Sequence, residues 1–258
     1  MTKAIFFDID GTLVSFHTHR IPDSTIDALN ELHRKGIKIF IATGRPKVLI
    51  DNLGDLKFDA YITVNGSYCF TAEGETIYKS SIPEDDIERL IAFHHTHPIP
   101  FVFVYDNEMF ITHINDAVLK VAELIEIPAP RIAPIEEARG KEILQMMGYF
   151  TSNEETEMFR KVLVHCEPMR WYPLFTDIIA HGNSKSKGID KVLEHYNIEL
   201  KDTMAFGDGG NDIPMLKHVA TGIAMGNAEA HVKAVADYIT TSVDEDGIAN
   251  GLKHFGLI

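Results

Sequence analysis

The chain has 258 residues, 45% of them hydrophobic, and a formal net charge of −14 at pH 7. Its length exceeds that of most single domains and its apolar content suffices for real cores, so we expect two domains. The negative charge argues against nucleic acid or an anionic membrane as a partner. Cys69 and Cys166 are too few for a disulfide framework, so we expect two buried thiols.

The N-terminal segment bears on the location of the protein. Thr2 and Lys3 lead into a short apolar run that Asp8 ends, which is too short for the core of a signal peptide. No apolar run in the sequence approaches the length of a membrane span. We therefore expect a cytoplasmic protein, either a monomer or a weak homo-oligomer.

The first apolar run, Ala4 to Phe7, predicts a buried parallel strand, and Asp8-Ile9-Asp10-Gly11-Thr12 follows it directly. A strand covered on both faces has no structural use for two acids at its end. If the strand continues, acids at positions i and i+2 point the same way, so one could attack a bound group while the other handles a proton. Taken alone, the motif is also compatible with solvated acids in an Asp-Gly turn.

A second apolar run, Ile37 to Ala42, predicts another buried strand and ends at Thr43-Gly44-Arg45-Pro46. The proline suits the first turn of a helix, so we expect a helix to follow. A helix start that carries a hydroxyl and free N–H groups can bind an anion. Arg45 could contact that anion or cap its own turn.

A third strand is predicted at Thr203 to Phe206, and it leads into Gly207-Asp208-Gly209-Gly210-Asn211-Asp212. A lysine-bearing segment, Asn183-Ser184-Lys185-Ser186-Lys187-Gly188, precedes that strand. Open α/β sheets bind ligands at the carboxyl ends of their strands. We therefore expect these segments to meet at one site.

Charge predicts what such a site would do. Asp8, Asp10 and Asp208 would repel one another, each contact costing roughly 4 kcal/mol at 4 Å for an effective dielectric near 20. A cation must lie among them, and an all-oxygen set with few carboxylates suits Mg²⁺ bridging a substrate phosphate. Thr43 and a lysine would hold the other phosphate oxygens while an Asp attacks phosphorus, and water would hydrolyse the aspartyl-phosphate.

In this order the four segments resemble motifs I to IV of the haloacid dehalogenase (HAD) superfamily of phosphatases, and the resemblance extends over the whole chain. The Cof-type subgroup, class IIB, has segments similar to Asn65-Gly66, Gly207 to Asp212, Ala224-Met225-Gly226-Asn227-Ala228, Ala236-Asp237-Tyr238 and Glu245-Asp246-Gly247-Ile248. The resemblance implies an α/β fold, with a Rossmann-like core on a parallel sheet and an inserted α+β cap of the C2B type. It also implies a Mg²⁺-dependent phosphatase that acts mainly on sugar phosphates and related metabolites.

Carried over by motif, the resemblance makes Asp8 the nucleophile and Asp10 the general acid and base. Asp208 would hold Mg²⁺ with Asp8 and the Asp10 carbonyl, and Asp212 would support these ligands. The residues implied to bind substrate in the core are Thr43, Gly44, Arg45, Lys185 and Asn211.

The lysine of motif III has two candidates. Lys185 is followed three residues later by Gly188 and an apolar helix, as is common in the subgroup. A helix capped near Ser184 would present Lys185 in its first turn, facing the anion site. Lys187, directly before the glycine, is the rival, and we favour Lys185.

The long interval between Thr43 and Lys185 locates the second domain. We place the core at 1–81 and 181–258 and the cap at 82–180, with Asp106-Asn107-Glu108 as a hairpin turn. Within the cap, strands are expected at 101–105, 109–112, 142–147 and 170–179, and helices at 84–95, 116–125 and 154–163.

Two features of the cap segment have alternative interpretations. Arg170-Trp171-Tyr172 combines a cation, the only tryptophan and a phenol, which could stack on a sugar and hold its hydroxyls. Packing in the cap core is the alternative for Trp171. His94, His95 and His97 could bind a metal, but neighbouring histidines at a helix end point in different directions, so we expect no metal there.

We therefore predict a Mg²⁺-dependent phosphatase that hydrolyses small phosphate monoesters, hexose or other sugar phosphates, through an aspartyl-phosphate. A sugar phosphomutase would use the same Asp8 and Asp10 but return the phosphoryl group to the sugar. A non-catalytic metabolite-binding protein on this scaffold is disfavoured, because every motif acid is present.

Overall fold

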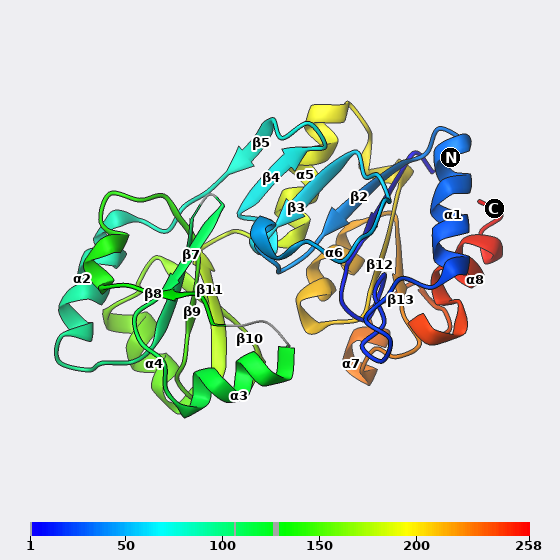
Figure 1. Ribbon diagram of the computed structural model, residues 1–258. Coiled ribbons are helices and arrows are strands. Elements are labelled where there is room, and N and C mark those ends of the chain that lie inside the picture. The colour runs from blue at the N-terminus through cyan, green and yellow to red at the C-terminus, as the bar shows by residue number, and fades with distance from the viewer. Residues whose placement is uncertain (1, 106, 126–128) are drawn as a thin grey trace. The chain divides into compact units, whose positions relative to one another are not determined.

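The computed structural model describes residues 2–105, 107–125 and 129–258 (Figure 1). The chain divides into two compact units. Unit 1 comprises Met1–Tyr78 and Ser184–Ile258, and unit 2 comprises Lys79–Asn183. Unit 2 is thus one contiguous insertion in the sequence of unit 1.

Unit 1 contains an eight-stranded sheet in the order β14-β13-β12-β1-β2-β3-β4-β5. The strands from β14 to β3 are parallel, and β4 runs antiparallel to β3. The strands are β1 (Ala4–Phe7), β2 (Lys38–Ala42), β3 (Ala60–Thr63), β4 (Tyr68–Thr71), β5 (Thr76–Lys79), β12 (Thr203–Gly207), β13 (Thr221–Ala224) and β14 (Tyr238–Ile239). The helices are α1 (Asp23–Arg34), α5 (Lys185–Tyr196), α6 (Ile213–His218), α7 (Ala230–Lys233) and α8 (Gly247–His254).

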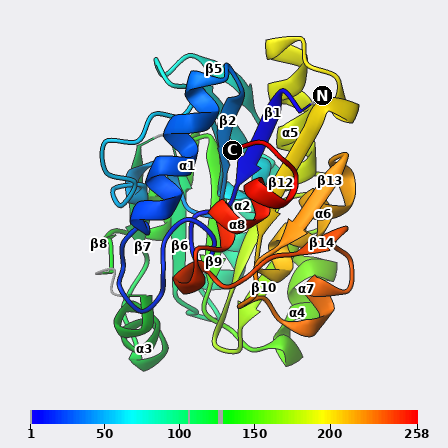
Figure 2. The same ribbon diagram turned by 90° about the vertical axis from the view of Figure 1, so that its right-hand side faces the viewer.

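The central strands of unit 1 are buried on both faces, which explains their unbroken apolar sequence. In β1, Ile5 and Phe7 pack with α1 and α8, whereas Ala4 and Phe6 pack with α5 and α6 on the opposite face (Figure 2). Alternate residues of β2 and β12 divide between the same two cores. This doubly covered parallel sheet is the α/β core that the sequence predicts.

Unit 2 is an α+β unit with a core of its own. Its six-stranded sheet has the order β10-β11-β9-β6-β7-β8, and all neighbours are antiparallel except β7 and β8. The strands are β6 (Phe101–Tyr105), β7 (Glu108–Ile111), β8 (Arg131–Ile132), β9 (Ile143–Gly148), β10 (Cys166–Tyr172) and β11 (Phe175–Ala180). The helices are α2 (Glu84–His94), α3 (Asp116–Ile125) and α4 (Ser152–Lys161).

Two expected elements differ from the structure. The segment after Pro46 forms only a 3₁₀ turn, Lys47–Leu49, in place of a full helix. The expected strand at 170–179 is two antiparallel strands, β10 and β11, which a turn containing Pro173 separates. Pro173 explains the second difference, because Pro removes a backbone donor and favours turns.

Three further expectations concern cysteines, a hairpin and membrane spans. Cys69 and Cys166 are free and buried, as expected. Strands β6 and β7 pair as an antiparallel hairpin, but Asp106 of its predicted turn lies outside the described residues. Among the described residues, no helix combines the length and the apolar character needed to cross a membrane.

Candidate active site

The parallel register of unit 1 brings three predicted segments to one edge of the sheet. Phe7, the last residue of β1, lies beside Ile41 of β2 and Phe206 of β12. The next residues along these chains are polar: Asp8 follows β1, Thr43 follows β2 and Asp208 follows β12. The sheet topology therefore assembles the site from segments that are far apart in the sequence.

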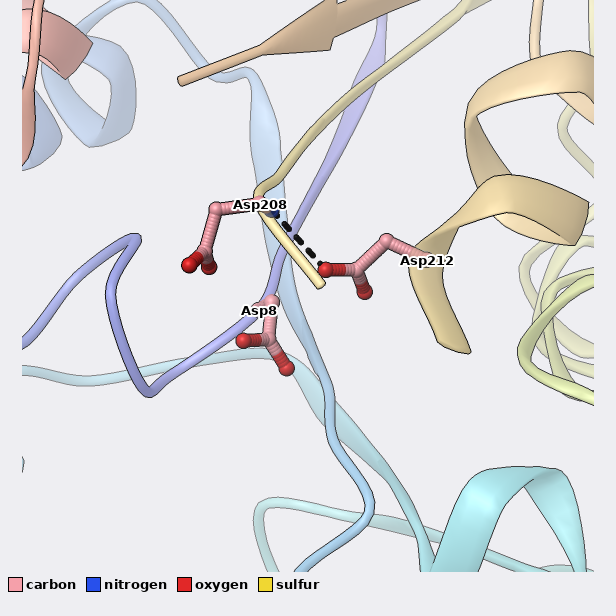
Figure 3. Close-up of side chains that lie close together, drawn as sticks. All are labelled: Asp8, Asp208 and Asp212. Atoms are coloured by element: carbon pink, nitrogen blue, oxygen red, sulfur yellow. Dashed lines mark hydrogen bonds between the residues drawn. The ribbon is translucent and has the colours of Figure 1, made fainter. Parts of the chain in front are cut away.

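Three carboxylates form a cluster at this edge. Asp8, Asp208 and Asp212 each offer an oxygen within 4.8 Å of the others, and Figure 3 shows their side chains. Asp212 lies in the turn after β12, where its Oδ2 accepts hydrogen bonds from the backbone N–H groups of Asp208 (2.9 Å) and Gly209 (2.8 Å). Asp212 thus belongs to the cluster and also shapes the loop that carries Asp208.

Lys185 is buried against this cluster. Its Nζ donates to Asp8 Oδ1 and to Asp212 Oδ1, each at 2.6 Å, and its side chain has no exposed surface. Ser184 caps α5 by accepting a hydrogen bond from the N–H of Lys187 at 3.1 Å, which places Lys185 at the first position of the helix. The side chain of Lys187 is exposed, so the geometry favours Lys185 as the lysine of the site.

The cluster carries more negative than positive charge. Burial raises the pKa of Asp8 well above its usual value against the lowering effect of Lys185, and the neighbouring Asp212 and Asp208 raise it further. Burial, with Asp212, also raises the pKa of Asp208 to about 7. One lysine does not offset three carboxylates, and their hard oxygen donors fit a divalent cation such as Mg²⁺.

Asp10 lies apart from the cluster and pairs with Arg45. The guanidinium of Arg45 donates from Nε to Asp10 Oδ2 and from Nη2 to Asp10 Oδ1, each at 2.7 Å. Arg45 also donates its backbone N–H to Thr43 Oγ1 at 3.1 Å. The second acid of the first motif is thereby linked to the loop after β2.

Gly44 and Asn211 also lie at this edge of unit 1. Asn211 Nδ2 donates to Asn65 Oδ1 at 3.2 Å. Gly44 lies against the same amide, because a Cβ at Gly44 would be 3.1 Å from Asn65 Oδ1. The structure therefore brings the expected core residues together and adds Asn65 to them.

Two further residues contact Asp208, and the sequence predicts a role for neither. Thr12 Oγ1 donates to Asp208 Oδ1 at 2.8 Å, and Asn227 Nδ2 donates to Asp208 Oδ2 at 3.2 Å. Asn227 Nδ2 also donates to the carbonyl of Gly11 at 2.8 Å. Thr12 belongs to the segment Asp8 to Thr12 and Asn227 to the segment Ala224 to Ala228, and membership in these motifs is the only feature of the sequence that points to either residue.

Gly11 is required where the two loops meet. Its φ is +77°, and a Cβ there would lie 2.2 Å from Asp208 Oδ2. Glycine is therefore the only residue that permits both this backbone conformation and the close approach of Asp208.

The two expected cap contacts lie on β10 of unit 2. Arg170 donates from Nε to Glu155 and from Nη2 to the carbonyl of Phe150, and its Nη1 reaches the carbonyls of Tyr172, Pro173 and Phe175. These bonds tie its guanidinium to the β10–β11 turn, to Glu155 of α4 and to Phe150, all within unit 2. The side chain of Trp171 lies outside the described part of the structure.

The histidines at the end of α2 and just after it have other neighbours in unit 2. His97 stacks on Phe93, with ring centroids 4.6 Å apart, and the ring of His94 lies 5.9 Å from that of His113. Within the described residues, the acidic cluster is the only group of three or more potential metal ligands with this spacing.

Known proteins match the chain over nearly its full length. A family model described as haloacid dehalogenase-like hydrolase matches residues 5–252. The solved structure of the HAD subclass IIB sugar phosphatase BT4131 is 50% identical, with a TM-score of 0.91 and 100% of both chains covered. That of BT1666, a HAD phosphatase from Bacteroides thetaiotaomicron, is 37% identical, with a TM-score of 0.93 and coverage of 100% of this chain and 96% of that chain. "Putative phosphatase YkrA" from Bacillus subtilis (strain 168) is 39% identical over 259 residues, which cover 100% of this chain and 99% of YkrA.

Proposed function

Because the chain belongs to the haloacid dehalogenase-like hydrolases and is a phosphoric monoester hydrolase, we propose that it is a Mg²⁺-dependent sugar phosphatase that forms an aspartyl-phosphate. The observation that carries this proposal is the buried Lys185 bound to Asp8 beside Asp208, with Asp10 two residues further along the same strand end. This set supplies a nucleophile, a cation site and a proton carrier within one unit.

The acidic cluster would hold the metal. Asp8, Asp208 and the carbonyl of Asp10 are the proposed ligands, while Asp212 fixes the loop and shares Lys185 with Asp8. When bound, the divalent cation supplies positive charge that offsets the carboxylates and the substrate phosphate. Thr12 and Asn227 hold the two oxygens of Asp208 and so restrict the orientation of that ligand.

The reaction has two steps. In the first, a carboxylate oxygen of Asp8 bonds to phosphorus, the bond between phosphorus and the ester oxygen breaks, and Asp10 gives that oxygen a proton to release the alcohol. In the second, a water oxygen bonds to phosphorus while Asp10 takes the proton of that water. The bond from phosphorus to Asp8 breaks, which releases inorganic phosphate and restores the carboxylate.

The phosphoryl oxygens would be held by groups from three loops. Lys185 brings a buried positive charge, Thr43 a hydroxyl, and Gly44 and Asn211 a backbone N–H and an amide. Preorganised donors of this kind stabilise the charge that develops on the phosphoryl group.

The proposed substrates are small phosphate monoesters, in particular hexose or other sugar phosphates. Support comes from the described activity of BT4131, a sugar phosphatase with 50% sequence identity. We propose that unit 2, expected at 82–180, is the cap that contacts the organic part of the substrate, with Trp171 as a candidate contact. Arg170 is not carried into this role, because its guanidinium is bound within unit 2.

Trapping the covalent intermediate tests the proposal. Asp8→Asn should release no phosphate from a hexose phosphate with Mg²⁺, because an amide cannot attack phosphorus. Asp10→Asn, quenched in acid during turnover of p-nitrophenyl phosphate, whose leaving group needs no proton, should carry one phosphoryl group on the peptide that contains Asp8, detected by mass spectrometry. Wild-type protein should release one phosphate per sugar formed.

Three results would contradict the proposal. Substantial phosphate release by Asp8→Asn would exclude the covalent route. Full activity in excess chelator would exclude the metal. Formation of an isomeric sugar phosphate without free phosphate would identify a phosphomutase instead.

A further inference from the structure

The pair of Asp10 and Arg45 has a geometry that the proposed reaction leaves unexplained. Both oxygens of the Asp10 carboxylate accept from one guanidinium, at 2.7 Å each. A bidentate fork of this kind fixes the plane and direction of a carboxylate, which a single-point contact from a lysine would not do.

Arg45 is itself held in place by its own loop. Nη1 donates to the carbonyl of Leu49 at 2.7 Å, the backbone N–H donates to Thr43 Oγ1 at 3.1 Å, and the Arg45 carbonyl accepts from the N–H of Val64 at 3.1 Å. The guanidinium is therefore held in a defined position by hydrogen bonds within its own loop.

The exposure of the two side chains indicates that the ion pair orients Asp10 more than it stabilises the fold. The side chains of Arg45 and Asp10 are 21% and 33% exposed, and ion pairs that reach water contribute little to stability. Orientation is what such a pair can still provide. Without it, the Asp10 carboxylate could turn among its rotamers.

We propose that Arg45 is the positioning residue of Asp10 and holds its carboxyl group in the one orientation from which a proton passes to and from the substrate oxygen. This inference rests on the proposed function, in which Asp10 is the acid and base. Either hydrogen bond of the fork can open to free one oxygen for the proton, while the other keeps the carboxyl group in place. Arg45 then acts through Asp10, in place of the phosphate contact or turn cap that the sequence allowed.

The test compares substrates that differ in their need for a proton. A sugar alkoxide must be protonated as it leaves, whereas a nitrophenolate leaves without help. Arg45→Met should lower kcat/KM for a hexose phosphate by about 10- to 100-fold, part of the effect of a general acid, and should affect p-nitrophenyl phosphate far less. Arg45→Lys should recover part of the loss, and inhibition by inorganic phosphate should stay unchanged in both variants.

Lys47→Met is the matched control. It removes the same charge two residues further along the loop, where Lys47 Nζ lies 4.7 Å from the centre of the Phe70 ring. It should leave the ratio of the two activities unchanged. The same ratio change in Lys47→Met as in Arg45→Met would overturn the inference, because charge alone would then explain it.

Further outcomes would also overturn the inference. Equal losses on both substrates, with weaker inhibition by phosphate, would mean that Arg45 binds phosphate. A lower melting temperature with an unchanged activity ratio would mean that it stabilises its turn.

Asp10→Asn, measured in parallel, separates this inference from the proposed function. If Asp10→Asn favours the aryl substrate and Arg45→Met does not, only the positioning role fails. If Asp10→Asn itself shows no preference, the acid and base role of Asp10 fails, and the inference with it.

Discussion

Lys185 is a buried positive charge that offsets part of the negative charge of the acidic cluster. Its Nζ donates to Asp8 and Asp212 and is shielded from water, whereas the side chain of Lys187, two residues further along, is exposed. This difference in burial decides how each lysine should respond to substitution.

Lys185→Met should reduce kcat by at least about 100-fold, because it removes a preorganised charge from the phosphoryl site. It should also lower the free energy of unfolding by about 3–5 kcal/mol, because Asp8 and Asp212 lose their buried partner. Lys187→Met should change stability by less than about 0.5 kcal/mol and leave activity intact. Steady-state kinetics and urea unfolding would check both, and the reverse pattern would transfer the role to Lys187.

Because the pKa of Asp208 is raised, we expect pH to have opposite effects on metal binding and on stability. Its pKa of about 7 lies above its usual 3.8 because of burial, so the folded protein takes up a proton that the unfolded chain takes up only at lower pH. Asp208 should therefore stabilise the metal-free protein at low pH. The stabilisation is complete below pH 3.8 and is lost as the pH rises through about 7.

Mg²⁺ affinity should move the other way, because the metal must displace that proton. Below pH 7 it should weaken by up to about tenfold per pH unit for one displaced proton. Titration calorimetry at several pH values measures how Mg²⁺ affinity changes with pH, and thermal unfolding of the metal-free protein measures how stability changes with pH. If affinity and stability changed with pH in the same direction, Asp208 would not be a ligand of the metal.

At the scale of elements, helix α5 is positioned by a contact at its start. A Cβ at Gly66 would lie 1.9 Å from the carbonyl oxygen of Ser184, the residue that caps α5 before Lys185. The φ of Gly66 is +95°, so the backbone there is also unfavourable for other residues. The turn after β3 therefore sets how closely α5 approaches the sheet.

Gly66→Ala should move the start of α5 and lower both kcat and stability. Gly74→Ala is the matched control, because Gly74 has a similar φ of +88° but open space around a Cβ. The control should cost only the conformational strain, roughly 1–2 kcal/mol, and keep full activity. Equal losses of activity in the two variants would mean that the contact with Ser184 does not position Lys185.

The sequence predicted those elements whose residues pack into one face or one core. The apolar run of β1, the Ser184 cap of α5 and the β6–β7 pair are found as expected. Strands β3, β4 and β5 were missed, because each contains a threonine and none is an unbroken apolar run like β1, and β5 is only partly buried. A short strand is recognised by the neighbour it pairs with, and a single sequence does not reveal that neighbour.

Some residues of the site could likewise be predicted from the sequence, and others could not. Strand ends predicted Asp8, Thr43 and Asp208, since parallel strands bring their ends to one edge. Asn227 was missed because its partner Gly11 is 216 positions away, and the pairing depends on how two loops fold. The Arg45 fork was missed for the same reason, since sequence gives a side chain's reach but not its direction.

At the scale of the whole molecule, the two units have separate cores. Within the described residues, one apolar cluster lies entirely in unit 2, and the two other large clusters lie entirely in unit 1. The proposed ligand site belongs to unit 1, and the only tryptophan, Trp171, belongs to unit 2. Tryptophan fluorescence therefore reports unit 2, whereas circular dichroism reports both units.

Mg²⁺ with vanadate should stabilise unit 1 alone, by about 2.7 kcal/mol at a ligand concentration 100 times Kd. In urea, the transition seen by circular dichroism should then split or broaden, while the fluorescence transition stays at the same urea concentration. An equal shift of both signals would show that the two units unfold together.

The insertion point of unit 2 has a consequence for inheritance. Unit 2 is encoded by one continuous stretch, Lys79–Asn183, and every residue named for the phosphoryl site lies outside it. Lys185 stands just two residues past the second junction. A single exchange of gene segments at these two junctions would replace the hydrophobic core of unit 2 and preserve the acids and the lysine of the site. Descendants of one gene could therefore diverge in the inserted unit and keep the same chemistry.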